Sequence, residues 1–188
     1  MPKQSKKLNN LSHQVLGVLA RQPRSGYDIV KQLENFRPAK TSQVYPTLAT
    51  LEDLGLVASQ DVEQTSRPNK RLYTVTDKGR QQLISWIGTE PDVPYNRDDF
   101  LTMAYSAWLQ TPAETIAMFE VRLSKLDRVI EQVQSALAVI LSDFPEALDD
   151  PGNWRFYRYN LQNRRLLLAQ SEQTWCRTMI YQLQKHVE

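Results

Sequence analysis

The sequence predicts a mainly α-helical protein in two parts, with one short β-hairpin in the first part. Apolar residues recur at helical spacing over most of the chain. Two short stretches rich in β-branched and aromatic residues stand on either side of a turn-forming segment. A stretch with two prolines and a glycine, "GTEPDVPYN", divides the chain. We therefore expect domains at residues 1–88 and 97–188, joined by a linker at 89–96.

Composition narrows the classes of protein that this chain can belong to. There is one cysteine, Cys176, and the only two histidines, His13 and His186, lie near opposite ends of the chain. These counts exclude an intrachain disulfide framework and a cysteine-based zinc site, and they support no histidine-centred catalytic site. Counting does not address carboxylate catalysis, but no motif points to it. We expect a protein that is not an enzyme and has no cofactor, with Cys176 as an apolar packing residue.

Hydropathy and charge indicate the compartment and the partner. The mean hydropathy is −0.51, and no apolar run approaches the roughly 18 residues of a membrane span. The first ten residues also lack the apolar stretch of a signal peptide, so we expect a cytoplasmic protein without membrane contact. Residues 1–96 carry 13 Lys and Arg against 9 Asp and Glu, whereas residues 97–188 carry 10 against 12. The first part is the one suited to a polyanion.

Two short helices are predicted first. "LSHQVLGVLARQP", residues 11–23, has apolar residues at helical spacing and ends at Pro23. "SGYDIVKQL", residues 25–33, opens with Ser25 and has an acid three residues later, Asp28, which is a variant of the capping box.

A third helix is predicted from "VYPTLATLEDLGLV", residues 44–57. The apolar residues at i, i+4 and i+7 from Val44 share one face, which is typical of an amphipathic helix docked on a core. Pro46 lacks an N–H and is tolerated only near a helix start. We therefore expect the helix to begin at about Ser42, with Thr41 or Ser42 as its N-cap.

The two ends of this third helix differ in character. At its C-terminal end we expect Gly55 in the left-handed conformation and Leu56 in contact with Leu51, as in a Schellman motif. Hydroxyls, an amide and a phenol lie on the exposed surface near the start, and the acids Glu52 and Asp53 lie beyond them. A helix that inserts its N-terminus into the major groove of DNA needs this polarity. An ordinary surface helix with neutral polar residues would show it too.

A β-hairpin is predicted next, from "LVASQDVE" (56–63) and "KRLYTVT" (70–76), separated by "QTSRPN". Three cations, Arg67, Lys70 and Arg71, surround the hairpin loop and can reach a phosphate backbone; solvated loop charge is the alternative interpretation.

Thr76 is the expected N-cap of a fourth helix that extends to Trp86 or Ile87, and we expect apolar residues of this helix, among them Ile84 and Ile87, to pack inward. Three short helices, the third with an exposed polar N-terminus, are typical of a helix-turn-helix core.

Three further helices are predicted after the linker, the first at 97–109. The second begins at "TPAE", with Thr111 as N-cap, Pro112 at N1 and Glu114 at N3, and ends before Pro145. Its apolar residues alternate at spacings of three and four, which predicts a heptad seam. The seam consists of Ile116, Phe119, Leu123, Leu126, Ile130, Val133, Leu137 and Ile140.

The last helix is predicted from Asp150 to the C-terminus with an apolar stripe of its own. The stripe consists of Trp154, Tyr157, Leu161, Leu168, Trp175, Met179 and Leu183. Helices of about 30 residues reach roughly 45 Å, too long for the first domain to cover. A second copy of the chain is the partner that we expect, giving a homodimer. The tryptophans of this part could line a hydrophobic pocket, but packing is their more common role, so no ligand residue is assigned.

Three segments together, "SGYDIVKQL", "VYPTLATLEDLGLV" and "RLYTVTDKGRQQL", resemble the signatures of PadR-like transcriptional regulators. The resemblance covers residues 9–88, and the length and helical content of 97–188 are similar to those of the larger members. It implies a winged helix-turn-helix domain with a β-hairpin wing, and an α-helical C-terminal dimerisation domain. It further implies a sequence-specific dimer, usually a repressor of a palindromic operator. Some members release DNA on binding phenolic acids or other small hydrophobic effectors.

One departure from the family pattern bears on DNA contact. Members often have basic residues after Tyr-Pro-x-Leu, where this chain has Ala49 and Thr50. We expect weaker phosphate contact from the middle of the helix, with the wing and the N-terminal lysines Lys3, Lys6 and Lys7 compensating.

The candidate DNA-binding residues form three groups. Residues expected in the groove are Ser42, Gln43, Tyr45 and Thr50; residues expected on phosphates are Lys40, Arg67, Lys70 and Arg71; and residues of the second helix expected on the backbone are Tyr27 and Lys31. Tyr27 could instead belong to the core. The alternative to DNA binding is a winged-helix module for protein–protein interaction, and the basic wing and acid-free helix start favour DNA.

Overall fold

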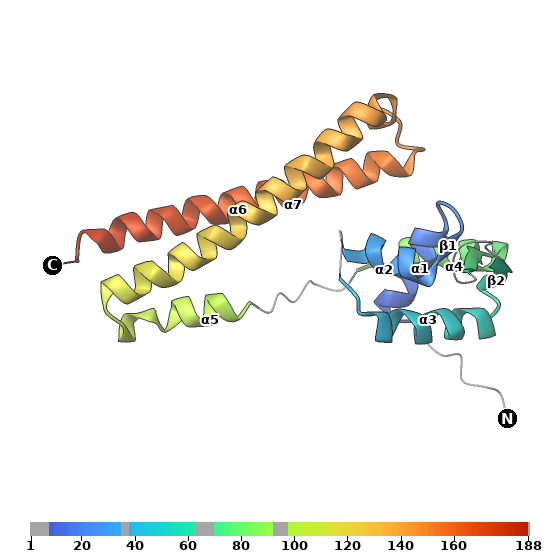
Figure 1. Cartoon of the computed structure of the whole chain (residues 1–188), viewed down its shortest axis with the longest axis horizontal. Helices are drawn as coiled ribbons and strands as arrows, with labels where there is room; N and C mark the ends of the chain where they lie inside the picture. Colours follow the sequence, from blue (N-terminus) through green and yellow to red (C-terminus); the bar gives the residue numbers. More distant parts are fainter. Residues whose placement is uncertain (1–7, 35–37, 63–69, 92–97, 188) are drawn as a thin grey trace. The chain divides into compact units, whose positions relative to one another are not determined.

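The computed structural model of the chain describes residues 8–34, 38–62, 70–91 and 98–187. The chain divides into two compact units, Met1–Val93 and Pro94–Glu188 (Figure 1). Most of the predicted linker, from residue 92 onward, lies outside the described residues.

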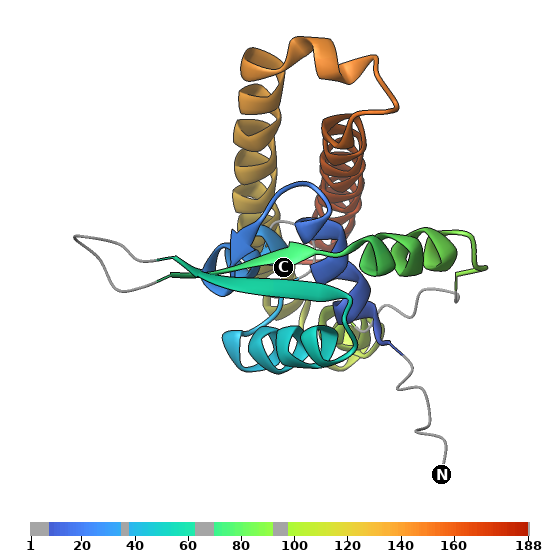
Figure 2. The same ribbon diagram turned by 90° about the vertical axis from the view of Figure 1, so that its right-hand side faces the viewer.

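The N-terminal unit combines four helices with a small antiparallel sheet. Its helices are α1 (Asn10–Leu19), α2 (Gly26–Glu34), α3 (Thr41–Asp53) and α4 (Asp77–Ile87), and its strands are β1 (Arg24–Ser25), β2 (Val57–Val62) and β3 (Lys70–Val75). Figure 2 shows β2 and β3 side by side, with their ends extending past the helices. This arrangement confirms the predicted winged helix-turn-helix order of elements.

The predicted two-stranded hairpin was incomplete, because the sheet has a third strand. The strand order is β1-β3-β2, with Arg24 opposite Tyr73 and Ser25 opposite Leu72. A strand of two residues has no periodicity to detect, so only the fold reveals it.

The core of this unit lies between the first three helices and the sheet. Its side chains from α3 are the three that the helical spacing indicated, Val44, Leu48 and Leu51, each at most 1% exposed. Their partners on the other elements include Val15, Leu16, Leu19, Ile29, Leu33, Leu56, Val57, Tyr73 and Val75.

The Schellman motif predicted after α3 is confirmed. Gly55 has a φ of 66°, the Leu56 N–H donates to the Leu51 carbonyl at 2.9 Å, and the Gly55 N–H donates to the Glu52 carbonyl at 2.8 Å. The motif turns the chain directly from α3 into β2.

The predicted N-cap of α4 is also confirmed, but its predicted packing is partly wrong. The Thr76 hydroxyl accepts the Gly79 N–H at 3.1 Å and donates to the Gly55 carbonyl at 2.8 Å. Ile84 and Ile87, expected inside, are 61% and 69% exposed. Leu83, the third apolar residue of this helix expected inside, does pack against the core, and the ring of Trp86 stacks on His13 of α1 at 4.3 Å between centroids.

The C-terminal unit is helical throughout its described residues. It consists of α5 (Asp99–Tyr105), the short 3₁₀ helix η1 (Ala107–Leu109), α6 (Pro112–Asp143), the 3₁₀ helix η2 (Pro145–Leu148) and α7 (Trp154–Gln184). The single helix predicted at 97–109 is therefore divided at Ser106. The last helix starts later than predicted, after the N-cap Asn153, whose side chain accepts the Arg155 N–H at 3.0 Å.

The helices α6 and α7 pack against each other along their lengths (Figure 1). The capping box of α6 forms as predicted, and its heptad seam faces inward, with Phe119, Leu126 and Val133 buried. The facing residues of α7 are Ala169 and Cys176. Cys176 has no exposed surface, and burial raises the pKa of its thiol, so it is a packing residue as expected.

The predicted apolar stripe of α7 does not lie entirely inside. Tyr157, Leu161 and Leu168 are 55%, 46% and 53% exposed, and Trp175 is 37% exposed. These four residues lie on one side of α7, at spacings of four and seven. Leu161 is followed directly by the buried Gln162, and consecutive residues of a helix point about 100° apart. Part of the apolar surface of α7 therefore remains uncovered within one chain.

No helix in the described ranges is both long enough and apolar enough to cross a membrane.

Candidate nucleic-acid interface

The recognition helix α3 begins one residue earlier than predicted. Its N-cap is Lys40, so the prediction of Thr41 or Ser42 as N-cap was wrong. The Gln43 side-chain carbonyl accepts the Lys40 N–H at 3.0 Å, and this bond stabilises the earlier start. The hydroxyls of Thr41 and Ser42 take no part in capping, and both side chains are exposed at the helix start.

Pro46 lies in the second turn of α3 and has no N–H for the Ser42 carbonyl. Two threonines that follow Pro46 bond back to the helix: the Thr47 hydroxyl donates to the Gln43 carbonyl at 2.8 Å, and the Thr50 hydroxyl donates to the Pro46 carbonyl at 3.0 Å. The Thr50 hydroxyl proton is thus engaged within the helix. Its methyl group and the acceptor side of its oxygen remain free of that bond.

Tyr45 joins the start of α3 to the start of α2. Its side chain is 45% exposed, and its ring lies directly over Gly26, where an added Cβ would come within 2.7 Å of Tyr45 Cζ. Tyr27, beside Gly26, is 69% exposed, so the interpretation of Tyr27 as a core residue is wrong. Two phenols therefore lie on the surface near the start of the recognition helix.

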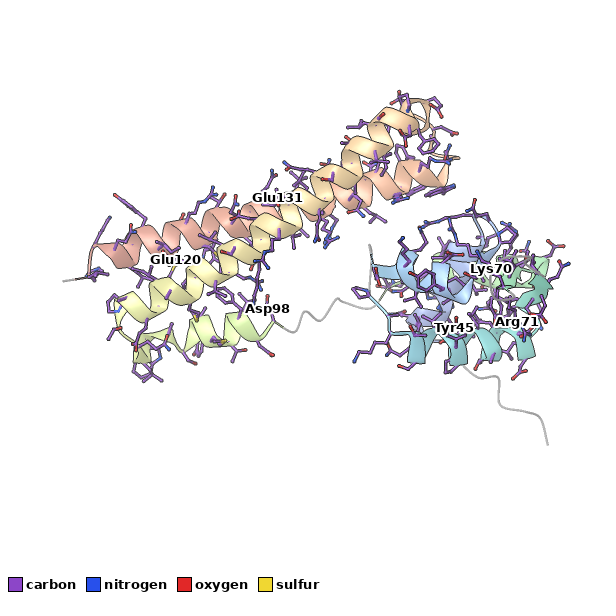
Figure 3. All side chains as sticks on the ribbon, viewed as in Figure 1. Tyr45, Lys70, Arg71, Asp98, Glu120 and Glu131 are labelled. Carbon is purple, nitrogen blue, oxygen red and sulfur yellow. The ribbon has the colours of Figure 1, made fainter. Side chains whose placement is uncertain are left out.

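Two of the predicted phosphate contacts are already paired within the chain. Lys70 Nζ lies 3.0 Å from Asp28 Oδ2 of α2. Arg71 Nη2 lies 3.1 Å from each carboxylate oxygen of Glu52 on α3. Both cations, labelled in Figure 3, begin strand β3, and their ion pairs tie this strand to α2 and to α3.

The carboxylates in these pairs are held in the charged form. A hydrogen bond from the Ser25 hydroxyl, with the charge of Lys70, lowers the pKa of Asp28 despite its partial burial. A hydrogen bond from Ser59, with the charge of Arg71, lowers the pKa of Glu52 in the same way. Both ion pairs are therefore intact at neutral pH.

The other predicted cations fall into two groups. Lys31 on α2 and Lys40 before α3 are exposed, and neither makes an ion pair within the described ranges. Arg67 and the N-terminal lysines Lys3, Lys6 and Lys7 lie outside the described residues.

Sequence reasoning missed the contacts that join these residues across the fold. Asp28 was recognised as a capping residue but not as the partner of Lys70, and Glu52 was recognised only as an acid far from the helix start. The support of Tyr45 by Gly26 was also missed. The only sequence signal for such pairs was opposite charge, which does not say which residues meet.

No group of three or more His, Cys, Asp or Glu residues that could hold a metal ion occurs in the part of the chain that the structure describes.

This fold and surface define a winged helix-turn-helix protein with a helical second unit. The family model described as "Transcriptional regulator PadR-like family" matches residues 15–85. The negative transcriptional regulator PadR of Bacillus subtilis is 26% identical over 181 residues, covering 93% of this chain and 98% of that protein. A probable transcriptional regulator of Mycobacterium tuberculosis is 35% identical over 88 residues, covering 45% of this chain and 46% of that protein.

Solved structures agree over nearly the whole chain. Bacillus subtilis PadR in complex with operator DNA matches with a TM-score of 0.80 and 26% identity, covering 93% of this chain and 99% of that chain. The same protein in complex with p-coumaric acid matches with a TM-score of 0.75 and 25% identity, covering 93% and 98%. Residues 15–85 therefore match the PadR-like family of transcriptional regulators, and the similarity to Bacillus subtilis PadR extends over both units.

Replacing Gly26 by alanine is expected to weaken DNA binding by moving Tyr45. The added Cβ would lie 2.7 to 2.9 Å from three atoms of the Tyr45 ring, which can swing away without unfolding the core. We expect an affinity loss of roughly tenfold, equivalent to about 1.4 kcal/mol, measured by fluorescence anisotropy on a labelled operator duplex. The Gly26→Ala change should add little once Tyr45→Ala is present, because both act on the same side chain.

Gly17→Ala is the matched control, since a Cβ there meets nothing within 4 Å. Gly26→Ala with wild-type affinity would show that the position of the Tyr45 ring does not matter for binding.

Proposed function

We propose that this protein is a dimeric, sequence-specific transcriptional repressor that binds a palindromic operator and releases it on binding a small hydrophobic effector. The observation that carries the proposal is the exposed, acid-free start of α3, together with a wing whose strand β3 begins with the cations Lys70 and Arg71. The similarity to a PadR solved with operator DNA extends over both units and supports the same role here.

We propose that α3 enters the major groove with its N-terminal half. Ser42, Gln43 and Tyr45 would contact base edges there, and Thr50 would present its methyl group one turn later. Lys31, Lys40, Arg67 and Lys70 would pair with phosphates, with Tyr27 donating its hydroxyl to the backbone. The Gln43 side-chain oxygen accepts the Lys40 N–H. To contact a base, the amide would either give up this bond or keep it and donate from its nitrogen.

We propose that the C-terminal unit, from residue 97 onward, holds two chains together. The support is the exposed side of α7, where Tyr157, Leu161, Leu168 and Trp175 form an apolar stripe that one chain leaves uncovered. A symmetric pair of chains would cover it and would place two recognition helices for the two halves of a palindrome. Residues 1–88, within the N-terminal unit, would be the DNA-binding domain in this division.

We propose a phenolic or similar hydrophobic acid as the effector class, because the relative from Bacillus subtilis has been solved with p-coumaric acid. No residue of this chain is assigned to the effector. The proposal gives the protein a binding role and no catalytic one, and places it in the cytoplasm, where bacterial operators lie.

A salt titration of DNA binding tests the proposal. A labelled duplex carrying the region upstream of the protein's own gene is compared with a scrambled duplex, for wild type and for a Tyr45→Ala, Lys40→Ala variant. With about four phosphate contacts per protomer, or about eight per dimer, the slope of log K against log salt should be near −7. We expect competitor-resistant binding by wild type that the variant loses.

Binding no tighter than to the scrambled duplex, with a shallow slope, would contradict operator binding and would favour the interaction-module interpretation. Addition of p-coumaric acid to the wild-type complex then tests the effector class: we expect dissociation, and full retention of DNA at saturating acid would contradict it.

A further inference from the structure

Three side chains form a closed hydrogen-bonded triangle where the recognition helix meets the wing. The Arg71 Nε–H donates to Ser59 Oγ at 2.8 Å, and Arg71 Nη2 donates to both oxygens of Glu52 at 3.1 Å. The Ser59 hydroxyl completes the triangle by donating to Glu52 Oε1. The three residues come from α3, β2 and β3.

The triangle restricts how the wing can move relative to α3. Glu52 lies in the last turn of the helix, and the other two residues lie on the two strands of the hairpin. Arg71 and Ser59 are on adjacent strands, where Asp61 faces Arg71 and Ser59 faces Tyr73 in the β2–β3 register. A single exposed ion pair stabilises little, but a planar guanidinium that bonds two residues through Nε and Nη2 fixes direction as well as distance.

The same contacts make Arg71 a poor candidate for binding phosphate. The bidentate Glu52 carboxylate offsets its charge and the bonds from Nε and Nη2 fix its direction, so only the Nη1 donors are left for another acceptor. The guanidinium also lies 5.8 Å from the centre of the Tyr73 ring. Lys70 differs, because it has one carboxylate partner, and an ammonium group keeps donors for a second acceptor.

We propose that Glu52, Ser59 and Arg71 act as a brace that positions the wing relative to the recognition helix, and that Arg71 supports operator binding through this brace and not by contacting a phosphate. In Figure 3 Tyr45 lies nearer the start of α3 and Arg71 lies beside its C-terminal end, so the brace holds the wing at the end of the helix away from Ser42, Gln43 and Tyr45. The inference rests on the proposed operator binding and assigns Glu52, an acid, a favourable role in it.

Two replacements by the neutral residue Gln, Glu52→Gln and Arg71→Gln, test the brace. The brace predicts that both weaken operator affinity to a similar extent, by roughly fivefold, and that the double variant is no worse than either single variant. It also predicts an unchanged salt slope, because no phosphate contact is lost. A direct phosphate contact predicts opposite signs: Arg71→Gln would weaken binding and reduce the slope by about 1.8 per dimer, and Glu52→Gln would tighten binding.

Asp53→Asn is the matched control. It removes the same charge one residue away, from an exposed side chain that makes no ion pair in the described ranges. If Asp53→Asn weakened binding as much as Glu52→Gln, the loss would not depend on the contact between Glu52 and Arg71, and the brace would be overturned. Circular dichroism melts of each variant confirm that the fold is retained.

The outcomes separate this inference from the proposed function. Wild-type protein that fails to prefer the operator contradicts the proposed function, and with it the brace. Wild-type protein that prefers the operator, with Glu52→Gln binding as tightly as wild type or more tightly, overturns the brace alone. Ser59→Ala gives an independent check, with an expected loss smaller than that of Arg71→Gln, because the ion pair remains.

Discussion

Replacement of Gly79 by alanine is expected to destabilise the N-terminal unit severely. A Cβ at this position would lie 2.1 Å from the Leu56 carbonyl oxygen and 2.9 Å from Val75 Cγ2. The Leu56 carbonyl cannot yield easily, because it accepts the Thr76 N–H at 3.0 Å and belongs to the turn that ends α3. We expect a loss of about 3 kcal/mol or more in the free energy of unfolding, measured by urea denaturation followed by circular dichroism.

Gly88→Ala provides the control for this prediction. Gly88 caps the other end of the same helix with a negative φ of −78°, and a Cβ there would lie 3.5 Å from the nearest atom, an ordinary contact. We expect the Gly88 variant to unfold close to wild type. Equal midpoints for the two alanine variants would show that the first turn of α4 can move off the α3–β2 turn, contrary to the tight packing that the distances describe.

Gly79 illustrates which parts of this protein can be predicted from its sequence. The N-caps Thr76 and Thr111 and the Schellman turn were predicted correctly because each depends on residues three to seven positions apart, whereas the N-cap of α3 and the start of α7 were wrong. The backbone contact between Gly79 and Leu56 joins residues 23 positions apart, and no periodicity carries it. The glycine was visible in the motif that indicated the family, but its physical reason appears only in the packed fold.

The candidate site divides in the same way. The start of α3 and the cations of the wing could be identified from residue type and order. What each side chain contacts could not, because Asp28 and Lys70 lie 42 positions apart and Glu52 and Arg71 lie 19 apart. A charged side chain on a folded surface has several oppositely charged residues within reach. Which of them it contacts depends on the register of the sheet and the angles between the helices.

The prediction that the apolar stripe of α7 packs inside was partly wrong for a different reason. Leu161 and Gln162 are neighbours in sequence, yet Gln162 is 7% exposed and Leu161 is 46% exposed. Hydropathy predicts a buried Leu161 and an exposed Gln162. The opposite is found in a single chain, and a second chain that covers the exposed side of α7 would account for the apolar residues there. The failure itself supports a second copy of the chain in the proposed function.

Replacement of Phe119 by alanine is expected to have the second large effect. Phe119 is 1% exposed and packs α6 against two other helices of the C-terminal unit, with its ring centre 5.3 Å from that of Phe100 of α5 and 5.4 Å from that of Trp175 of α7. The cavity should cost about 3 to 5 kcal/mol. Chemical denaturation of the full chain, followed by near-ultraviolet circular dichroism, measures the loss.

The consequence for DNA binding follows from the position of Trp175. This residue packs its ring on Phe119 and also belongs to the exposed stripe of α7, so a cavity at Phe119 loosens the surface proposed to hold two chains together. A preformed dimer binds a palindromic operator more tightly than two separate chains do, because its second half-site contact costs no further loss of translational freedom. Sedimentation analysis should therefore show weaker association, and operator affinity should fall with it.

Val121→Ala separates this effect from helix weakening in general. Val121 lies two residues further along α6 and is 56% exposed, so its truncation should change stability by less than about 0.5 kcal/mol. If Phe119→Ala loses stability as expected but keeps its dimer and its operator affinity, the C-terminal unit is not what joins the chains. The uncovered apolar residues Ile84 and Ile87 of α4 would then be the next surface to test as the dimer contact.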